Sequence, residues 1–151
     1  MKAKQIYPSH YGYTPAMWRL NVQGQHKERV FKIGKFFVNN RHDFRPGDVL
    51  LIQVIKGDEP GRFVKRVKGL MIFESLSEDA EEESESIYGK RWRYAIIPSM
   101  VYRFKSEESF NLNDVIGRER ARRYDGQAEA IRLIPEDEAS LRERISSRLP
   151  T

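Results

Sequence analysis

The chain of 151 residues lacks cysteine and contains only three histidines. Without cysteine it can form no disulfide bond, no thiolate zinc site and no cysteine nucleophile. The histidines, His10, His26 and His42, do not have the spacing of a metal site. The sequence also lacks a nucleophile elbow, a Walker loop and a glycine-rich dinucleotide turn. We therefore expect no metal, no cofactor and no enzymatic activity.

The chain also lacks an apolar run long enough for a signal peptide or a membrane span, so we expect a cytoplasmic protein with no membrane partner. Positive charge is in excess, with 27 Lys and Arg against 22 Asp and Glu and a formal net charge of +5. This balance favours a polyanionic partner, DNA or RNA, through counterion release. The length and the hydrophobic fraction of 39% suit one core, so we expect an N-terminal arm at 1–16 and one domain at 17–149.

Apolar periodicity predicts a fold rich in strands. The expected strands lie at 17–22, 49–55, 62–73, 94–102 and 128–134. The strand at 49–55 follows a turn at Pro46-Gly47-Asp48, and its continuous apolar run is typical of a central strand covered on both faces. Gly69 is expected at a bulge or a close approach, and Pro98 at an edge or a bulge. The turn formers at 57–61 predict a hairpin or meander between the second and third of these strands.

Helices are predicted mainly in the C-terminal third. Residues 111–116 form a capped single turn, and Pro135 with three acidic residues after it begins a helix whose apolar face carries Leu141, Ile145 and Leu149. The acidic segment 77–86 has no apolar anchor except Ala80, which predicts a mobile loop. The expected fold class is α+β, a bent β-barrel of about five to six strands with short flanking helices and a C-terminal helix.

Six segments share one order and spacing with a known family. They are the strand around Trp18 and the ranges 34–41, 45–50, 67–73, 91–94 and 133–138. Together they resemble an EVE domain of the PUA-like superfamily, to which YTH, ASCH and PUA domains also belong. The resemblance covers about 17–149, and it implies a PUA-like barrel that binds DNA or RNA and takes a flipped, modified base into an aromatic pocket. It further implies an effector, a separate protein or a fused nuclease or motor. The acidic segment and the N-terminal arm depart from the family pattern.

Two tryptophans lie on segments that match the pocket-forming ones of that family, Trp18 and Trp92. Extruding a base costs a few kcal/mol and stacking returns about 1–3 kcal/mol per base, so two rings are needed. A tryptophan in an alternating strand, as Trp18 is, belongs more often to plain core than to a cage. Asn39 and Asn40 can read the edge of a base or form a left-handed turn. The predicted base-binding residues are Trp18, Phe37, Asn39, Asn40, Trp92 and Tyr94.

The cations form three clusters, at 27–45, 90–93 and 118–123. If the barrel brings them to one face, they form a phosphate track, and we then expect the acidic segment on the opposite side. The predicted phosphate-binding residues are Lys35, Arg41, Lys90, Arg91, Arg93, Arg118, Arg120, Arg122 and Arg123. The alternative for 118–123, where Glu119 interrupts the run, is a solvated turn.

The predicted function is recognition of a base in nucleic acid without catalysis. One alternative comes from the ASCH branch, which contains hydrolases of nucleosides or RNA, and there Lys35 and Glu74 could perform acid–base work. A second alternative is a protein-docking module that uses the tyrosine-rich arm and the terminal helix.

Overall fold

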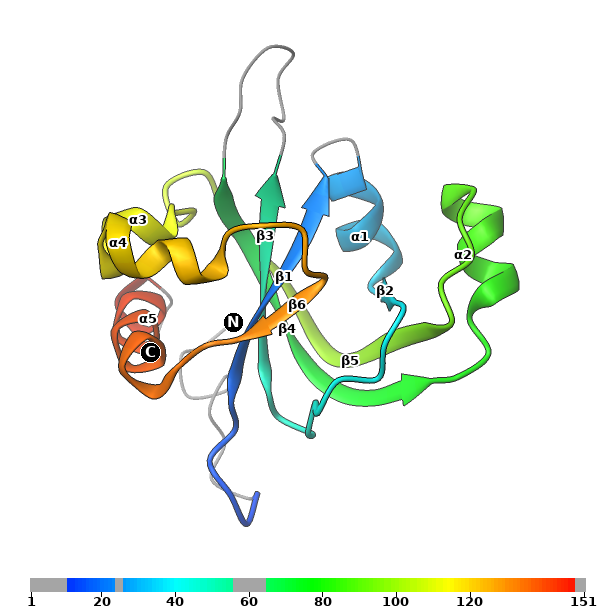
Figure 1. The fold of residues 1–151 in the computed structure, drawn as a ribbon, viewed down its shortest axis with the longest axis horizontal. Helices are drawn as coiled ribbons and strands as arrows, with labels where there is room; N and C mark the ends of the chain where they lie inside the picture. The colour runs from blue at the N-terminus through cyan, green and yellow to red at the C-terminus, as the bar shows by residue number, and fades with distance from the viewer. Residues whose placement is uncertain (1–10, 24–25, 56–64, 149–151) are drawn as a thin grey trace.

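A mixed six-stranded sheet, curled into a half-barrel, forms the centre of the molecule (Figure 1). The computed structural model describes residues 11–23, 26–55 and 65–148. The strands are β1 (Met17–Gln23), β2 (Phe36–Val38), β3 (Val49–Ile55), β4 (Arg66–Ser77), β5 (Tyr94–Arg103) and β6 (Ala130–Arg132). They lie in the order β2-β5-β4-β3-β1-β6, and β1 with β3 is a parallel pair. The other neighbouring pairs are antiparallel.

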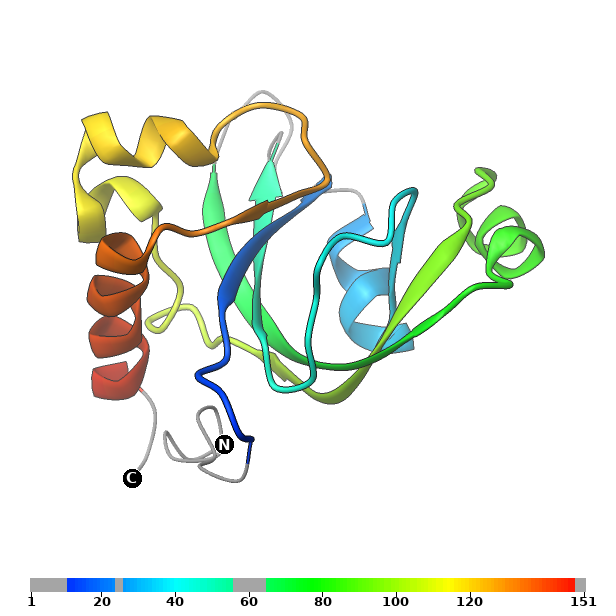
Figure 2. The same cartoon turned by 60° about the horizontal axis from the view of Figure 1, so that its bottom comes forward.

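Helices cover both faces of the sheet. They are α1 (Lys27–Ile33), α2 (Glu81–Tyr88), α3 (Leu112–Ile116), α4 (Arg118–Ala121), the 3-10 helix η3 (Arg122–Tyr124) and α5 (Pro135–Arg148). Figures 1 and 2 show α3, α4 and α5 gathered on one side of the sheet, with α1 and α2 toward the other. The α+β fold class with a curled sheet and a C-terminal helix is therefore confirmed. No helix in the described ranges is long and apolar enough to cross a membrane.

The buried strand β3 separates two cores. Val49 and Leu51 pack with α3, α4 and α5, whereas Leu50 and Ile52 pack in the cluster that contains Val30 of α1. Successive side chains of a strand point to opposite faces, so an unbroken apolar run is what a strand between two cores requires. The predicted central, doubly covered strand is confirmed. The predicted turn at 57–61 lies outside the described residues.

Two local predictions in the sheet are also confirmed. A Cβ atom on Gly69 would lie 2.5 Å from the Phe31 ring and 2.5 Å from the carbonyl oxygen of Tyr102, and the β3–β4 register shifts beside Gly69. Pro98 lies at a second shift, in the β4–β5 pairing. A residue without a side chain allows the close approach, and a bulge tolerates a residue that lacks an N–H group.

The predicted C-terminal helices are present. The Asn111 side chain caps α3 by accepting a hydrogen bond of 2.9 Å from the backbone N–H of Asn113. Leu141 and Ile145 of α5 are buried against the sheet, as the periodicity predicts. The segment 118–123 is helical and belongs to α4 and η3, so the alternative of a solvated turn is wrong there. The alternating pattern at 128–134 contains β6, which is only three residues long.

The prediction of a mobile acidic loop is also wrong, because residues 81–88 form the helix α2. Three glutamates in its first turn interact favourably with the helix dipole. The helix ends at Gly89, whose φ of 72° is the left-handed conformation that glycine adopts without strain. Ala80 and Ser84 are buried and attach the helix to the rest of the molecule. Of these two anchors, Ala80 was recognised from the sequence and Ser84 was missed. The helix α1, with buried Val30, was not predicted either.

Candidate functional site

A cavity of about 530 Å³ opens where the two edge strands of the curled sheet approach each other. Residues that follow β2 and residues that precede β6 line it together with β1, α1 and the end of α2. We call the gap between β2 and β6 the edge seam. No backbone ladder joins these two strands, because each is an edge of the sheet. Side chains must therefore bridge the seam.

Glu129 makes this bridge. Its carboxylate accepts hydrogen bonds of 2.8 and 2.9 Å from the backbone N–H groups of Asn39 and Asn40, and a third, of 3.1 Å, from the Asn40 side chain. The Nε2 atom of His42 lies 2.8 Å from the same carboxylate. The left-handed backbone of this loop is at His42, with φ of 52°, and not at Asn39 or Asn40. The alternative of a left-handed turn at Asn39-Asn40 is therefore wrong.

Three aromatic rings meet at one wall of the cavity. Phe37 and Trp92 are stacked, with ring centroids 6.3 Å apart and planes 17° from parallel. Tyr88 stands nearly perpendicular to both, at 5.9 Å from Phe37 and 5.5 Å from Trp92. Phe37 is buried, whereas Tyr88 and Trp92 are half-buried. Two of the three rings thus keep exposed surface beside the cavity.

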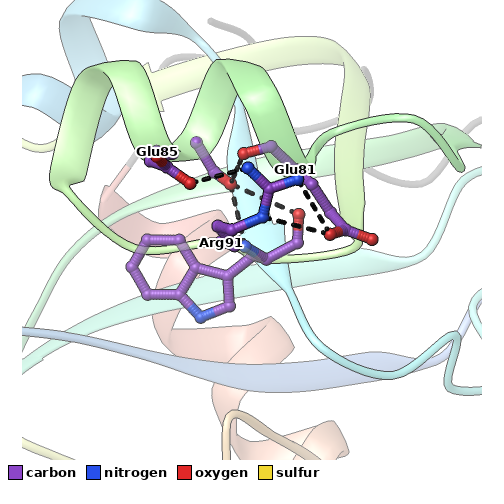
Figure 3. Close-up of polar contacts among 5 residues, drawn as sticks. Glu81, Glu85 and Arg91 are labelled. Atoms are coloured by element: carbon purple, nitrogen blue, oxygen red, sulfur yellow. Dashed lines mark hydrogen bonds and ion pairs between the residues drawn. The ribbon is translucent and has the colours of Figure 1, made fainter.

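The helix α2 holds Trp92 in this arrangement. The buried Ser84 hydroxyl oxygen accepts a hydrogen bond of 2.8 Å from the backbone N–H of Trp92. The preceding residue, Arg91, is paired with Glu85 at 2.7 Å and with Glu81 at 3.3 Å (Figure 3). The two glutamates lie one helical turn apart, so a single guanidinium can contact both. The acidic segment therefore orients the aromatic wall.

The polar wall of the cavity consists mainly of neutral groups. Its amide side chains are those of Asn21, Gln23, Asn39, Asn40 and Gln127. Burial, followed by the nearby charges of Arg29 and Lys90, lowers the pKa of His26 below its usual 6.5, so this imidazole is neutral at pH 7. Among the described lining residues, only Lys90 and Glu129 carry charge. The Lys90 ammonium lies 5.9 Å from the centroid of the Trp92 ring.

Trp18 does not line the cavity, and its predicted role as a cage wall is not supported. Its side chain is 6% exposed and packs in the core that contains Leu50 and Ile52. Its indole N–H donates a hydrogen bond of 2.9 Å to the buried carboxylate of Asp48. Val22, which does line the cavity, is four residues further along β1, or about 13 Å. Trp18 is therefore a core residue, which was the alternative to a cage wall.

Tyr94 also belongs to the core. Its ring is 7% exposed and packs in the cluster of Trp18, away from the described cavity lining. The guanidinium groups of Arg41 and Arg93 lie 5.7 and 5.3 Å from its centroid. Of the six predicted base-binding residues, the structure thus brings four together at the cavity, namely Phe37, Asn39, Asn40 and Trp92.

Five of the nine predicted phosphate-binding cations are already in ion pairs. Lys35 pairs with Glu83 at 3.0 Å, Arg41 with Glu78, and Arg91 with α2 as described. On the other side of the sheet, Arg120 and Arg123 pair with acidic residues of α5. The acidic segment lies beside Lys35, Arg41 and Arg91, so the expectation that it lies on the side opposite the predicted phosphate contacts is wrong for these three. Lys90 lines the aromatic cavity, Arg93 lies over Tyr94, and Arg118 and Arg122 line a second cavity.

Sequence reasoning missed ten of the fifteen described lining residues, among them His26, Tyr88, Gln127 and Glu129. A signal existed for Tyr88, because Tyr88-Gly89 has the pattern of a helix end followed by a glycine cap. No local sequence signal existed for Gln127 and Glu129, because the curl of the sheet is what brings their segment to the cavity. Lys35 and Glu74, the pair of the hydrolase alternative, are not among the described lining residues.

In the part of the chain that the structure describes, no three His, Asp or Glu side chains gather closely enough to hold a metal ion. The groups that line the cavity are aromatic and aliphatic side chains, amides, one neutral imidazole, one ammonium and the Glu129 carboxylate. Comparison with known proteins adds nothing to this inventory, because no family model and no curated protein matches the chain.

Proposed function

We propose that the protein is a nucleic-acid-binding module, a PUA-like domain of the EVE type, that takes a base from DNA or RNA into this cavity. One observation carries the proposal: half-buried aromatic rings and neutral amides line the same open cavity of about 530 Å³. Sites for small ligands have volumes of about 300–1,000 Å³ and combine apolar walls with a few polar groups. A flat, neutral heterocycle with donors and acceptors on its edge matches both parts of the lining.

The base would stack on the exposed side of Trp92 or Tyr88. Phe37 and Trp92 are already in contact with each other, so the base cannot enter between them without separating a stacked pair. Lys90 lies over the Trp92 ring and would move aside to contact a base oxygen or a neighbouring phosphate. Base–aromatic stacking of this kind contributes about 1–3 kcal/mol per base.

Two amides can read the edge of the bound base. Asn39 and Gln127 are exposed at the cavity from opposite sides of the edge seam, and neither side chain has a partner among the described residues. The Asn40 side chain is less suitable, because it donates to Glu129.

A modification on the base has a place in the same site. Val22, Val30, Phe36 and Ile55 supply apolar lining, against which a methyl group would be favourable. We propose binding without turnover, in the cytoplasm, with a separate or fused nuclease or motor acting after recognition. The hydrolase alternative is less favoured because its acid–base pair lies away from the cavity.

The test is fluorescence anisotropy with matched DNA and RNA oligonucleotides that carry no modification, methylated adenine or methylated cytosine. We expect one modified base to bind best, and we expect Trp92→Ala to weaken that binding by about 5- to 150-fold, which corresponds to about 1–3 kcal/mol of stacking. Trp92→Phe keeps a ring and serves as the matched control with a smaller loss. Equal binding of all oligonucleotides by wild type and Trp92→Ala would contradict base recognition, and absence of binding would contradict the proposal as a whole.

A further inference from the structure

A second cavity, of about 310 Å³, lies on the other side of the segment 125–129. Gln127 and Glu129 of this segment line the first cavity, and Asp125 lines the second. The strands connect the two cavities as well, because Gln53 of the second donates a hydrogen bond of 3.0 Å to Asn21 of the first. Figure 1 shows the chain crossing the open end of the sheet between η3 and β6. The two cavities are therefore direct neighbours.

Hydrogen bonds from side chains of β1 fix the wall between them. The fully buried guanidinium of Arg19 donates to the carbonyl oxygens of Tyr124 and Ala128, at 3.0 and 2.5 Å. Asn21 donates to the carbonyl oxygen between them, that of Gly126, at 2.8 Å. Burial lowers the pKa of Arg19 to about 10, so this guanidinium stays charged at neutral pH. Side chains of β1 thus hold the carbonyl groups of every second residue from 124 to 128.

Positive charge dominates the second cavity. Its described lining contains three cations, Lys65, Arg118 and Arg122, and one carboxylate, Asp125. Lys65 pairs with Asp125 at 2.8 Å, which leaves the two arginines. Both are exposed, and neither side chain has an ion pair or hydrogen bond among the described residues. Their neighbours in the same helical stretch, Arg120 and Arg123, are instead paired with acidic residues of α5.

Arg118 and Arg122 are four residues apart, so they lie about one helical turn from each other on the same side of α4 and η3. Two like charges at this spacing repel each other unless an anion lies between them. A phosphate group offers several oxygens in the geometry that guanidinium groups bind best. A phosphate ester in a strand fits the setting better than a carboxylate, because the neighbouring cavity is the one suited to a base.

We propose that the second cavity binds a phosphate group of the strand whose base occupies the first cavity, with Arg118 and Arg122 as its ligands. The identity of the ligand rests on the proposed function. Asp125 and Gln127 are two residues apart, at most about 7 Å, so the wall between the sites is thin enough for one strand to contact both. The base specifies which nucleotide binds, and the phosphate adds affinity that is independent of the base.

The experiment compares the double variant Arg118→Gln/Arg122→Gln with wild type and with Arg132→Gln/Lys105→Gln. The control variant removes the same charge from two exposed residues that line neither cavity. Anisotropy measures the oligonucleotide that wild type prefers at several salt concentrations, and calorimetry measures the matching nucleoside, which has no phosphate. We expect the double variant to bind the oligonucleotide about tenfold more weakly with a salt slope smaller by about one, and to bind the nucleoside as wild type does.

The outcomes separate the two proposals. Oligonucleotide affinity and salt slope in the double variant equal to those of the control would overturn the phosphate site, even if the nucleoside binds. If wild type binds no nucleoside and no oligonucleotide, the proposed function fails, and titration with inorganic phosphate tests the second cavity alone. Shifts in the NMR signals of the Arg118 and Arg122 side chains, absent for Arg132, would then support an anion site, and unchanged signals would overturn it.

Discussion

Replacing Glu129 by glutamine tests how the edge seam holds the cavity together. The Glu129 side chain is only 21% exposed, and its two oxygens accept from the backbone N–H groups of Asn39 and Asn40 and contact His42. Glutamine has the same shape but replaces one acceptor oxygen by an NH₂ group. That group cannot accept from a backbone N–H, so at least one of the two donors loses its partner.

The magnitude follows from these contacts. A hydrogen bond to a charged group contributes about 1.5–3 kcal/mol, and one between neutral groups about 0.5–1.5 kcal/mol. Losing one charge-assisted bond and weakening a second amounts to about 2 kcal/mol, after allowance for water that can reach the exposed part of the site. For a domain of this size the corresponding fall in Tm is about 4–8 °C.

Denaturant unfolding measures the change, and amide hydrogen exchange at Asn39 and Asn40 locates it. Glu129→Gln should lower the midpoint of unfolding and speed exchange at these two amides. The matched control is Glu119→Gln, an exposed glutamate of α4, which should alter the free energy of unfolding by less than about 0.5 kcal/mol. Equal stability of the two variants, or unchanged exchange at the two amides, would refute the view that this carboxylate closes the seam.

Two further predictions concern the core. Gly69→Ala should lower the free energy of unfolding by about 1–3 kcal/mol, because the added methyl group meets the Phe31 ring at 2.5 Å. The control Gly12→Ala, where nothing lies within 4 Å of the added methyl group, should leave the stability unchanged. Equal denaturation midpoints for the two variants would contradict the close approach at Gly69. Burial, and then the hydrogen bond to Asp137, raise the pKa of Tyr124 to about 12 from 10.0. Folding therefore favours the neutral phenol, and this stabilisation is complete below pH 10 and lost as the pH rises through about 12. Tyrosinate absorbance of wild type minus Tyr124→Phe should show one group titrating near pH 12, and a step near pH 10 would contradict the buried hydrogen bond.

The sheet could be predicted from sequence because its signals are local. The apolar run of β3 specifies a strand and also requires two cores, since adjacent residues such as Leu50 and Leu51 must each be buried on opposite faces. Gly69 and Pro98 predict irregular pairing because one lacks a side chain and the other lacks an N–H group. None of these inferences depends on a distant residue.

The environment of Trp18 could not be predicted from local sequence signals. Alternation along β1 correctly gives the face of the sheet on which Trp18 lies, but that face contains both the core and the cavity. The ring is assigned to the core by Asp48, which is 30 residues away in sequence and accepts the indole N–H. Composition and period contain no information on such a pair, so the choice between core and cage stayed open.

The helix α2 was missed for a related reason. A run of carboxylates predicts repulsion and solvation only if no cations approach it. Here Lys35 and Arg41, more than 35 residues earlier in the chain, pair with Glu83 and Glu78. The long-range pairs remove the repulsion that made a mobile loop the natural prediction, and the helix is then free to orient Trp92.

The same ion pairs change how the net charge of +5 should be interpreted. Carboxylates occupy five of the nine predicted phosphate contacts, so only four of these nine cations are available to a strand. Of the remaining four, Lys90 lines the first cavity, Arg118 and Arg122 line the second, and Arg93 lies over the Tyr94 ring. Each phosphate neutralised adds about 0.7–0.9 to the salt slope, so these four cations together would contribute a slope of about 3–4. In the proposed complex, stacking and hydrogen bonding in the first cavity supply the specificity for the base, and these four cations add affinity that does not depend on the base.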